Sequence, residues 1–123
     1  MKRLTFGRYF KECRIRAGLT LRAFCIKHAF DPGNISRLER GLLPPPQSED
    51  KLSEYARALG LRRGSDEWFE FFDLAAAESG RVPKDILSRK EVVAKLPVLF
   101  RTLRGKKITE SHLDSLVEKI RRT

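Results

Sequence analysis

The chain has 123 residues, of which 41% are hydrophobic and 34% charged, and its formal net charge is +10. This length allows one domain, or one small domain with an appendage, and the composition is typical of soluble globular proteins. No apolar run approaches the roughly 20 residues needed to cross a bilayer, and the charged N-terminus has no signal-peptide core. We therefore expect a cytoplasmic protein without a membrane partner.

Helical spacing of apolar residues runs through the chain, and no alternating run predicts a strand. Residues three and four apart predict a first helix over residues 6–17, which Gly18 ends. Thr20 is placed to cap a second helix over residues 21–29. The inner face of this second helix is expected to carry Phe24, Cys25 and His28.

The stretch DPGNISRLERG, residues 31–41, predicts a third helix although it begins with two poor helix formers. Asp31 is a good N-cap, and Pro32 at the first helical position loses no hydrogen bond because its N–H would be unpaired anyway. Ile35 and Leu38 are three residues apart and are expected to face inward. Gly41 is expected to end the helix.

The second half of the chain is also expected to be helical. After the stiff connector LLPPPQ, Ser48 is expected to cap a fourth helix that ends near residue 59, and Ser65 a fifth. Beyond Pro83 we expect a short helical piece, then a helical turn that starts at Pro97. The last segment carries apolar residues at the 0, 3, 4, 7 spacing of an amphipathic helix, namely Leu113, Leu116, Val117 and Ile120.

The stretch GLTLRAFCIKHAFDPGNISRLERG, residues 18–41, resembles the lambda-repressor-like family, also called Cro/cI-type or XRE-type helix-turn-helix domains. The resemblance covers about residues 6–61, and GLT and LERG are its most specific parts. It implies an all-α fold, with a five-helix lambda-repressor-like bundle and additional C-terminal helices. We therefore expect a DNA-binding domain at residues 1–61, and at residues 62–123 a helical C-terminal extension for dimerisation or partner binding.

In this family the third helix lies in the major groove of double-stranded DNA, and the start of the second helix meets a phosphate. Carried over position by position, the resemblance implies a set of DNA-binding residues at the starts of these two helices and along the third: Thr20, Arg22, Pro32, Gly33, Asn34, Ser36, Arg37 and Arg40.

The expected contacts differ along this set. Arg37 is the candidate for direct readout, because a guanidinium can donate two hydrogen bonds to guanine, and Asn34 could pair with adenine or contact the backbone. Pro32 and Gly33 have small side chains without donors, which lets the helix approach the groove closely. The remaining polar and basic residues are expected to contact phosphate or to lie beside the base-facing residues.

Two further expectations follow from the resemblance. The turn position that is usually glycine is Ala29 here, and a left-handed conformation at this residue would cost about 1 kcal/mol. The family pattern also implies that Glu39 pairs with Arg14 and ties the third helix to the first. This would make Glu39 a structural residue rather than a contact to DNA.

No grouping of catalytic or metal-binding residue types in the sequence favours an enzyme. Cys13 and Cys25 are twelve residues apart without a second pair, so we expect buried free thiols rather than a zinc or redox site. His28 and His112 are isolated, and no motif supplies a third metal ligand. We therefore predict no catalytic residue, no metal and no cofactor.

The distribution of charge along the chain indicates which partners it can bind. Residues 1–47 hold ten Lys and Arg against three Asp and Glu, and residues 81–123 hold twelve against five, whereas residues 48–80 hold four against eight. Basic ends favour polyanionic partners.

The cluster of Trp68, Phe69, Phe71 and Phe72 is expected to be buried on two sides, either in the core or in a dimer interface. Two hypotheses remain: a homodimeric repressor, or an antitoxin that also binds a toxin protein.

Overall fold

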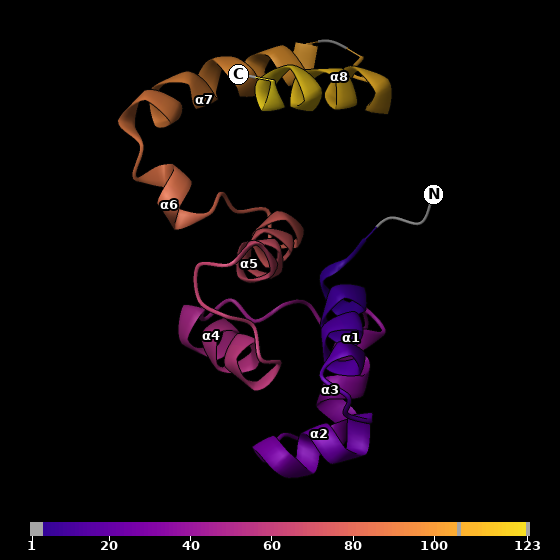
Figure 1. Cartoon of the computed structure of the whole chain (residues 1–123). Helices are drawn as coiled ribbons and strands as arrows, with labels where there is room; N and C mark the ends of the chain where they lie inside the picture. Colours follow the sequence, from indigo (N-terminus) through magenta and orange to yellow (C-terminus); the bar gives the residue numbers. More distant parts are fainter. Residues whose placement is uncertain (1–3, 106, 123) are drawn as a thin grey trace. The chain divides into compact units, whose positions relative to one another are not determined.

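The computed structural model describes residues 4–105 and 107–122. Within these residues all regular structure is helical, with eight helices and no strand (Figure 1). The prediction of an all-α fold is therefore confirmed. The chain divides into two compact units, one that ends at Pro83 and one that begins at Lys84. No helix in the described ranges is long and apolar enough to span a membrane.

The first unit holds five helices: α1 (Phe6–Arg16), α2 (Leu21–His28), α3 (Pro32–Glu39), α4 (Glu49–Ala58) and α5 (Asp66–Glu78). Before each helix, a side-chain oxygen accepts the backbone N–H of the residue three places further on. These N-caps are Thr5, Thr20, Asp31, Ser48 and Ser65. A cap of this kind typically stabilises a helix by about 1 kcal/mol. The four caps predicted from the sequence, all but Thr5, are confirmed.

An aromatic core joins α1, α2, α4 and α5. The ring of Phe10 meets the rings of Phe24 and Tyr55 edge-on, with centroids 5.8 and 5.5 Å apart. The rings of Phe6 and Phe71 lie 4.8 Å apart. The buried apolar residues of the first four helices and their ends are Phe6, Tyr9, Phe10, Cys13, Phe24, Cys25, Ile35, Leu38, Leu52, Tyr55, Ala56 and Leu59. The inner face predicted for α3, Ile35 and Leu38, is confirmed, whereas in α2 His28 is only half-buried.

Helix α5 completes this core rather than standing apart from it. Phe71 is 0% exposed and Ala75 is 2% exposed. The backbone N–H of Phe6, at the start of α1, donates to Glu78 Oε1 at 2.8 Å. The first compact unit therefore extends to Pro83, past the boundary expected at residue 61.

The aromatic cluster of α5 has one side in the core and one side exposed. Phe71 is buried, and Trp68 and Phe72 are half-buried against the core. Phe69 is 45% exposed, so the core of this unit buries only one side of the cluster, and burial of the other side in a dimer interface stays a prediction. The position of Phe69 on the helix turns it away from the stripe that Phe71 and Ala75 form, because residues four apart share a helix face.

The turn between α2 and α3 keeps a left-handed residue at Ala29. Ala29 has φ 57° and ψ 43°, and no other described residue except glycine has a positive φ. Its side chain is exposed, so replacing it by glycine removes no packing. The turn is nevertheless in place, because Phe30 N donates to Cys25 O at 3.0 Å and the Phe30 ring packs against the core.

We expect Ala29→Gly to raise the free energy of unfolding by about 1 kcal/mol, because glycine adopts the left-handed conformation without the Cβ penalty. In a domain of this size the midpoint of thermal unfolding should rise by about 4–8 °C. The matched control is Ala23→Gly, at an exposed right-handed position of α2, which should lower the midpoint instead. Equal effects of the two substitutions would contradict the interpretation.

The second unit consists of α6 (Lys84–Leu87), α7 (Lys90–Gly105) and α8 (Glu110–Arg121). The short helix expected after Pro83 and the final amphipathic helix are both present. None of the described residues from Lys84 onward is buried. The large hydrophobic side chains exposed on α7 and α8 are Val93, Val98, Leu99, Phe100, Leu103, Leu113, Leu116, Val117 and Ile120.

Helix α7 begins earlier than the sequence predicted. Pro97 was expected to start a helical turn, but it lies inside a helix that begins at Lys90. Proline in a helix interior removes one backbone hydrogen bond. Here the apolar spacing of Val92, Val93 and Leu96 continues past the proline to the apolar residues of the second half of the helix. This common face accounts for one helix instead of two.

Candidate nucleic-acid interface

The helical pair α2 and α3 is held in a single geometry by its two caps and by the residues it buries. Thr20 Oγ1 accepts the N–H of Ala23 at 3.1 Å, and Asp31 Oδ2 accepts the N–H of Asn34 at 2.8 Å. The buried side chains of the pair are Phe24, Cys25, Ile35, Leu38 and Glu39. Helix α3 packs against both α1 and α2, so its remaining face is the one open to a ligand.

A buried ion pair ties α3 to α1. Arg14 Nε donates to Glu39 Oε2 at 2.7 Å, and Arg14 Nη2 donates to Glu39 Oε1 at 2.9 Å. The third donor, Arg14 Nη1, meets the carbonyl oxygen of Leu19 at 2.9 Å, just before α2. The two residues are 7% and 8% exposed. The hydrogen bonds that Arg14 donates to Glu39 raise the pKa of Arg14, because they stabilise the charged guanidinium. The pairing predicted from the sequence is therefore confirmed.

Gly7 sets how closely α1 and α3 approach, and sequence reasoning missed it. A Cβ placed on Gly7 would lie 2.3 Å from the carbonyl oxygen of Leu38 and 2.9 Å from that of Glu39. No side chain fits at these distances from backbone atoms, so only glycine permits this contact. The sequence signal is a single glycine in the first turn of a helix, which carries no information about what packs there.

The sequence-predicted DNA-binding residues lie at the start of α2 and along α3. Gly33 and Ser36 are half-buried and the others are exposed: Thr20, Arg22, Pro32, Asn34, Arg37 and Arg40. The hydroxyl oxygen of Thr20 is already engaged as the cap of α2. Arg40 lies at the end of α3, where its Nε is 3.3 Å from the carbonyl oxygen of Ser36.

Three of these residues come together at the start of α3. Arg37 Nη2 donates to Asn34 Oδ1 at 2.7 Å. A Cβ on Gly33 would lie 3.5 Å from both terminal nitrogens of Arg37. The guanidinium of Arg37 therefore lies over Gly33 and beside Asn34.

The local charge favours an anionic ligand at this face. Of the three carboxylates in residues 4–47, Glu39 is buried against Arg14, Asp31 accepts a backbone N–H of α3, and Glu12 is exposed on α1. The exposed charged side chains of α2 and α3 themselves are cationic: Arg22, Lys27, Arg37 and Arg40. A polyanion approaching this face meets guanidinium and ammonium groups at close range.

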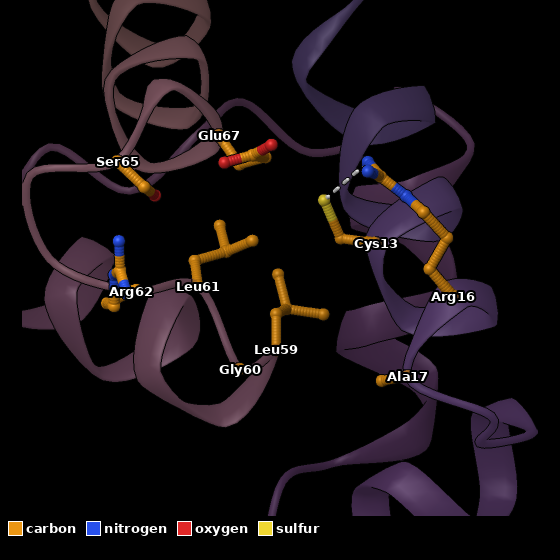
Figure 2. A pocket seen from close by; sticks show the side chains of 9 residues that line it. All are labelled: Cys13, Arg16, Ala17, Leu59, Gly60, Leu61, Arg62, Ser65 and Glu67. Atoms are coloured by element: carbon orange, nitrogen blue, oxygen red, sulfur yellow. Dashed lines mark hydrogen bonds between the residues drawn. The ribbon is translucent and has the colours of Figure 1, made fainter.

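A separate hollow of about 560 Å³ lies between the end of α1, the end of α4 and the start of α5. Figure 2 shows the side chains of Leu59 and Leu61 directed into it, with Cys13 and Arg16 on the opposite wall. The sulfur of Cys13 accepts from Arg16 Nη2 at 3.4 Å, and burial raises the pKa of this thiol. A thiol kept neutral in this way is a poor nucleophile. None of the predicted DNA-binding residues lines the hollow.

The histidines and cysteines take part in core packing and in helix capping. His28 packs against the rings of Phe24 and Phe30, with centroids 5.0 and 6.0 Å away. His112 Nδ1 accepts the N–H of Thr109 in the capping box of α8. Cys13 and Cys25 are free and buried, as expected. In the described parts of the chain, no group of three or more His, Cys, Asp or Glu side chains is arranged to hold a metal ion.

Comparisons with known proteins agree with the geometry of the first unit. A family model described as a helix-turn-helix domain matches residues 5–67, which is just over half of the chain. The match covers the helices α1 to α4 and the start of α5. Curated proteins yielded no significant match, and solved structures yielded none.

Proposed function

Because the chain belongs to the helix-turn-helix domain family, we propose that it is a sequence-specific transcriptional repressor that inserts α3 into the major groove of DNA. The observation that carries the proposal is the pair of exposed guanidinium groups of Arg37 on α3 and Arg40 at its end. The Arg14–Glu39 pair holds this helix against α1. A rigid helix presenting donors to the groove is what base readout requires.

The proposed contacts divide into two kinds. Arg37 pairs with guanine through two N–H groups, and Pro32 and Gly33 let the start of α3 approach the base edges. Arg40 and Arg22 contact phosphates, together with the capped start of α2 after Thr20. Ser36 is half-buried beside the base-facing residues. Occupation of a promoter by this surface would block transcription without any bound cofactor.

We expect Arg37→Ala and Arg40→Ala to differ in kind. Removing Arg37 should lower discrimination at one base pair by about 1–3 kcal/mol, whereas removing Arg40 should weaken binding to all sequences and reduce the slope of log affinity against log salt by about one unit. The measurement is a selection of bound DNA from a random pool, followed by salt titrations on the selected site. Equal weakening by Arg37→Ala on selected and random DNA would contradict its role in readout.

We further propose that the repressor acts as a homodimer. A single α3 with Pro32 and Gly33 in two base-facing positions reads few bases, and a two-fold dimer doubles the readout by meeting two half-sites. The support is the second unit, in which side chains such as Leu113, Leu116 and Val117 are all at least 44% exposed. An apolar face of this extent is typical of a protein interface.

The same exposed face supports a second candidate function, that of an antitoxin whose α7 and α8 cover a toxin protein while its helix-turn-helix controls its own operon. The two functions differ in what the purified chain does alone. A repressor dimerises and binds its operator without help. An antitoxin of this kind would instead form its stable complex through α7 and α8 with the product of a neighbouring gene, and co-purification of the two products tests this.

A further inference from the structure

The guanidinium of Arg37 is held in place before any ligand arrives. Long side chains on a helix point back toward its N-terminus and meet residues three and four positions earlier. For Arg37 those residues are Asn34 and Gly33. The Nη2 to Oδ1 distance to Asn34 is 2.7 Å, although both side chains are exposed. A Cβ placed on Gly33 would lie 3.5 Å from both terminal nitrogens, which is ordinary van der Waals contact, so the guanidinium lies directly over this residue.

The chemistry of the contact fixes the orientation of Asn34. A guanidinium has five N–H donors and no acceptor, so its partner on Asn34 must be the carbonyl oxygen and not the amide nitrogen. An asparagine that reads adenine needs that oxygen to accept from the adenine amino group. The contact with Arg37 occupies one of the two lone pairs of this oxygen and fixes the amide by a bond within the protein, which favours a supporting role over readout of adenine.

Arg37 in turn keeps what guanine readout needs. Asn34 engages one N–H of Nη2, and whichever of the two it takes, one edge of the guanidinium still presents two adjacent N–H groups. Those two groups match the O6 and N7 acceptors of guanine. Holding the side chain in one orientation also lowers the rotamer entropy lost on binding, which for an arginine is considerable.

We propose that Asn34 is a positioning residue, which orients Arg37 over Gly33 for readout of a single guanine and makes no base contact of its own. This inference rests on the proposed function and assigns its specificity: each half-site contains a guanine at the position that Arg37 faces. Asn34 and Arg37 then act as one unit on one base pair, rather than as two readers of two base pairs.

A double-mutant cycle on the full-length chain tests this. The binding site comes from a selection with the unaltered protein, and each base pair is then varied in turn. Arg37→Ala should lose about 5- to 150-fold of discrimination at one guanine. Asn34→Ala should lose discrimination at the same guanine, and the double variant should match Arg37→Ala within about twofold because the two residues are coupled. Replacing that guanine by 7-deazaguanine, which lacks N7 but keeps O6, should reduce the effect of both substitutions, whereas hypoxanthine, which keeps O6 and N7, should preserve it.

Asn34→Asp supplies the conservative variant. Aspartate still accepts from Arg37 but cannot donate to adenine N7, so it should keep the guanine preference while its added charge weakens binding to every sequence. Loss of preference at a different base pair, additive with Arg37→Ala, would overturn the positioning role and leave the proposed function standing. Failure of the unaltered protein to select any sequence would overturn both. The thermal unfolding midpoint of each variant shows whether a loss of binding reflects unfolding instead.

Discussion

Glu39→Ala is expected to lower the free energy of unfolding by about 3–5 kcal/mol, because it leaves the Arg14 guanidinium buried without its charged partner. Two of the three hydrogen bonds that Arg14 makes go to Glu39. A loss of this size is a large part of the total stability of a small domain. Thermal or urea unfolding measures it directly.

Two control variants show whether the loss of stability comes from the burial of the ion pair or from the removal of any charge. Glu54→Ala breaks the exposed Lys51–Glu54 pair, at 3.5 Å and 42% and 51% side-chain exposure, and should cost at most about 1 kcal/mol. The double variant Arg14→Leu, Glu39→Leu should recover much of the loss, because it removes both buried charges and fills the space with apolar groups.

Glu39→Gln should lower the melting temperature and weaken DNA binding only in step with it. Full stability with lost binding would instead make Glu39 a contact residue.

The helices of the first unit can be predicted from the sequence because their caps and inner faces depend on residues that lie close together in the chain. Caps at Thr20, Asp31 and Ser48 need only an oxygen at the right offset from a helix. The inner faces need only the helical period, and the Arg14–Glu39 pair is implied by the family pattern. In each case the determining residues are close together in the sequence or belong to a recognised motif.

The features that the sequence did not predict depend on contacts between distant residues. Gly7 matters only because the carbonyl oxygens of Leu38 and Glu39, some thirty positions later, lie within 3 Å of the place where a Cβ would be. The place of α5 in the core depends on Phe71 meeting Phe6, which no local pattern reveals. The contact between Arg37 and Asn34 is local, but it depends on which rotamer the arginine adopts. The spacing of the two residues alone allows Asn34 either to contact a base or to position Arg37.

Helix α5 also decides how the two halves of the chain can be separated experimentally. A chain ending at residue 61 would lose Phe71 and Ala75, which are among the most buried residues of the core. A chain ending at Pro83 keeps every buried residue that the structure describes, since none lies beyond it. We therefore expect the shorter chain to be unfolded by circular dichroism and the longer one to fold cooperatively.

The chain ending at Pro83 is expected to be monomeric and to bind a two-fold operator about 100-fold or more weakly than the full chain, because linking two recognition helices raises affinity by roughly 10²–10⁴. Truncation also removes basic residues, so Leu116→Asp in the full chain is the matched variant. It places a carboxylate in the exposed apolar face of α8 and keeps every Lys and Arg. If the second unit holds the dimer, this variant should sediment as a monomer and lose affinity for the two-fold operator, while a single half-site should be bound as before, apart from one unit of charge. A full-length chain that sediments as a monomer, both free and on a selected site without two-fold symmetry, would refute the dimer.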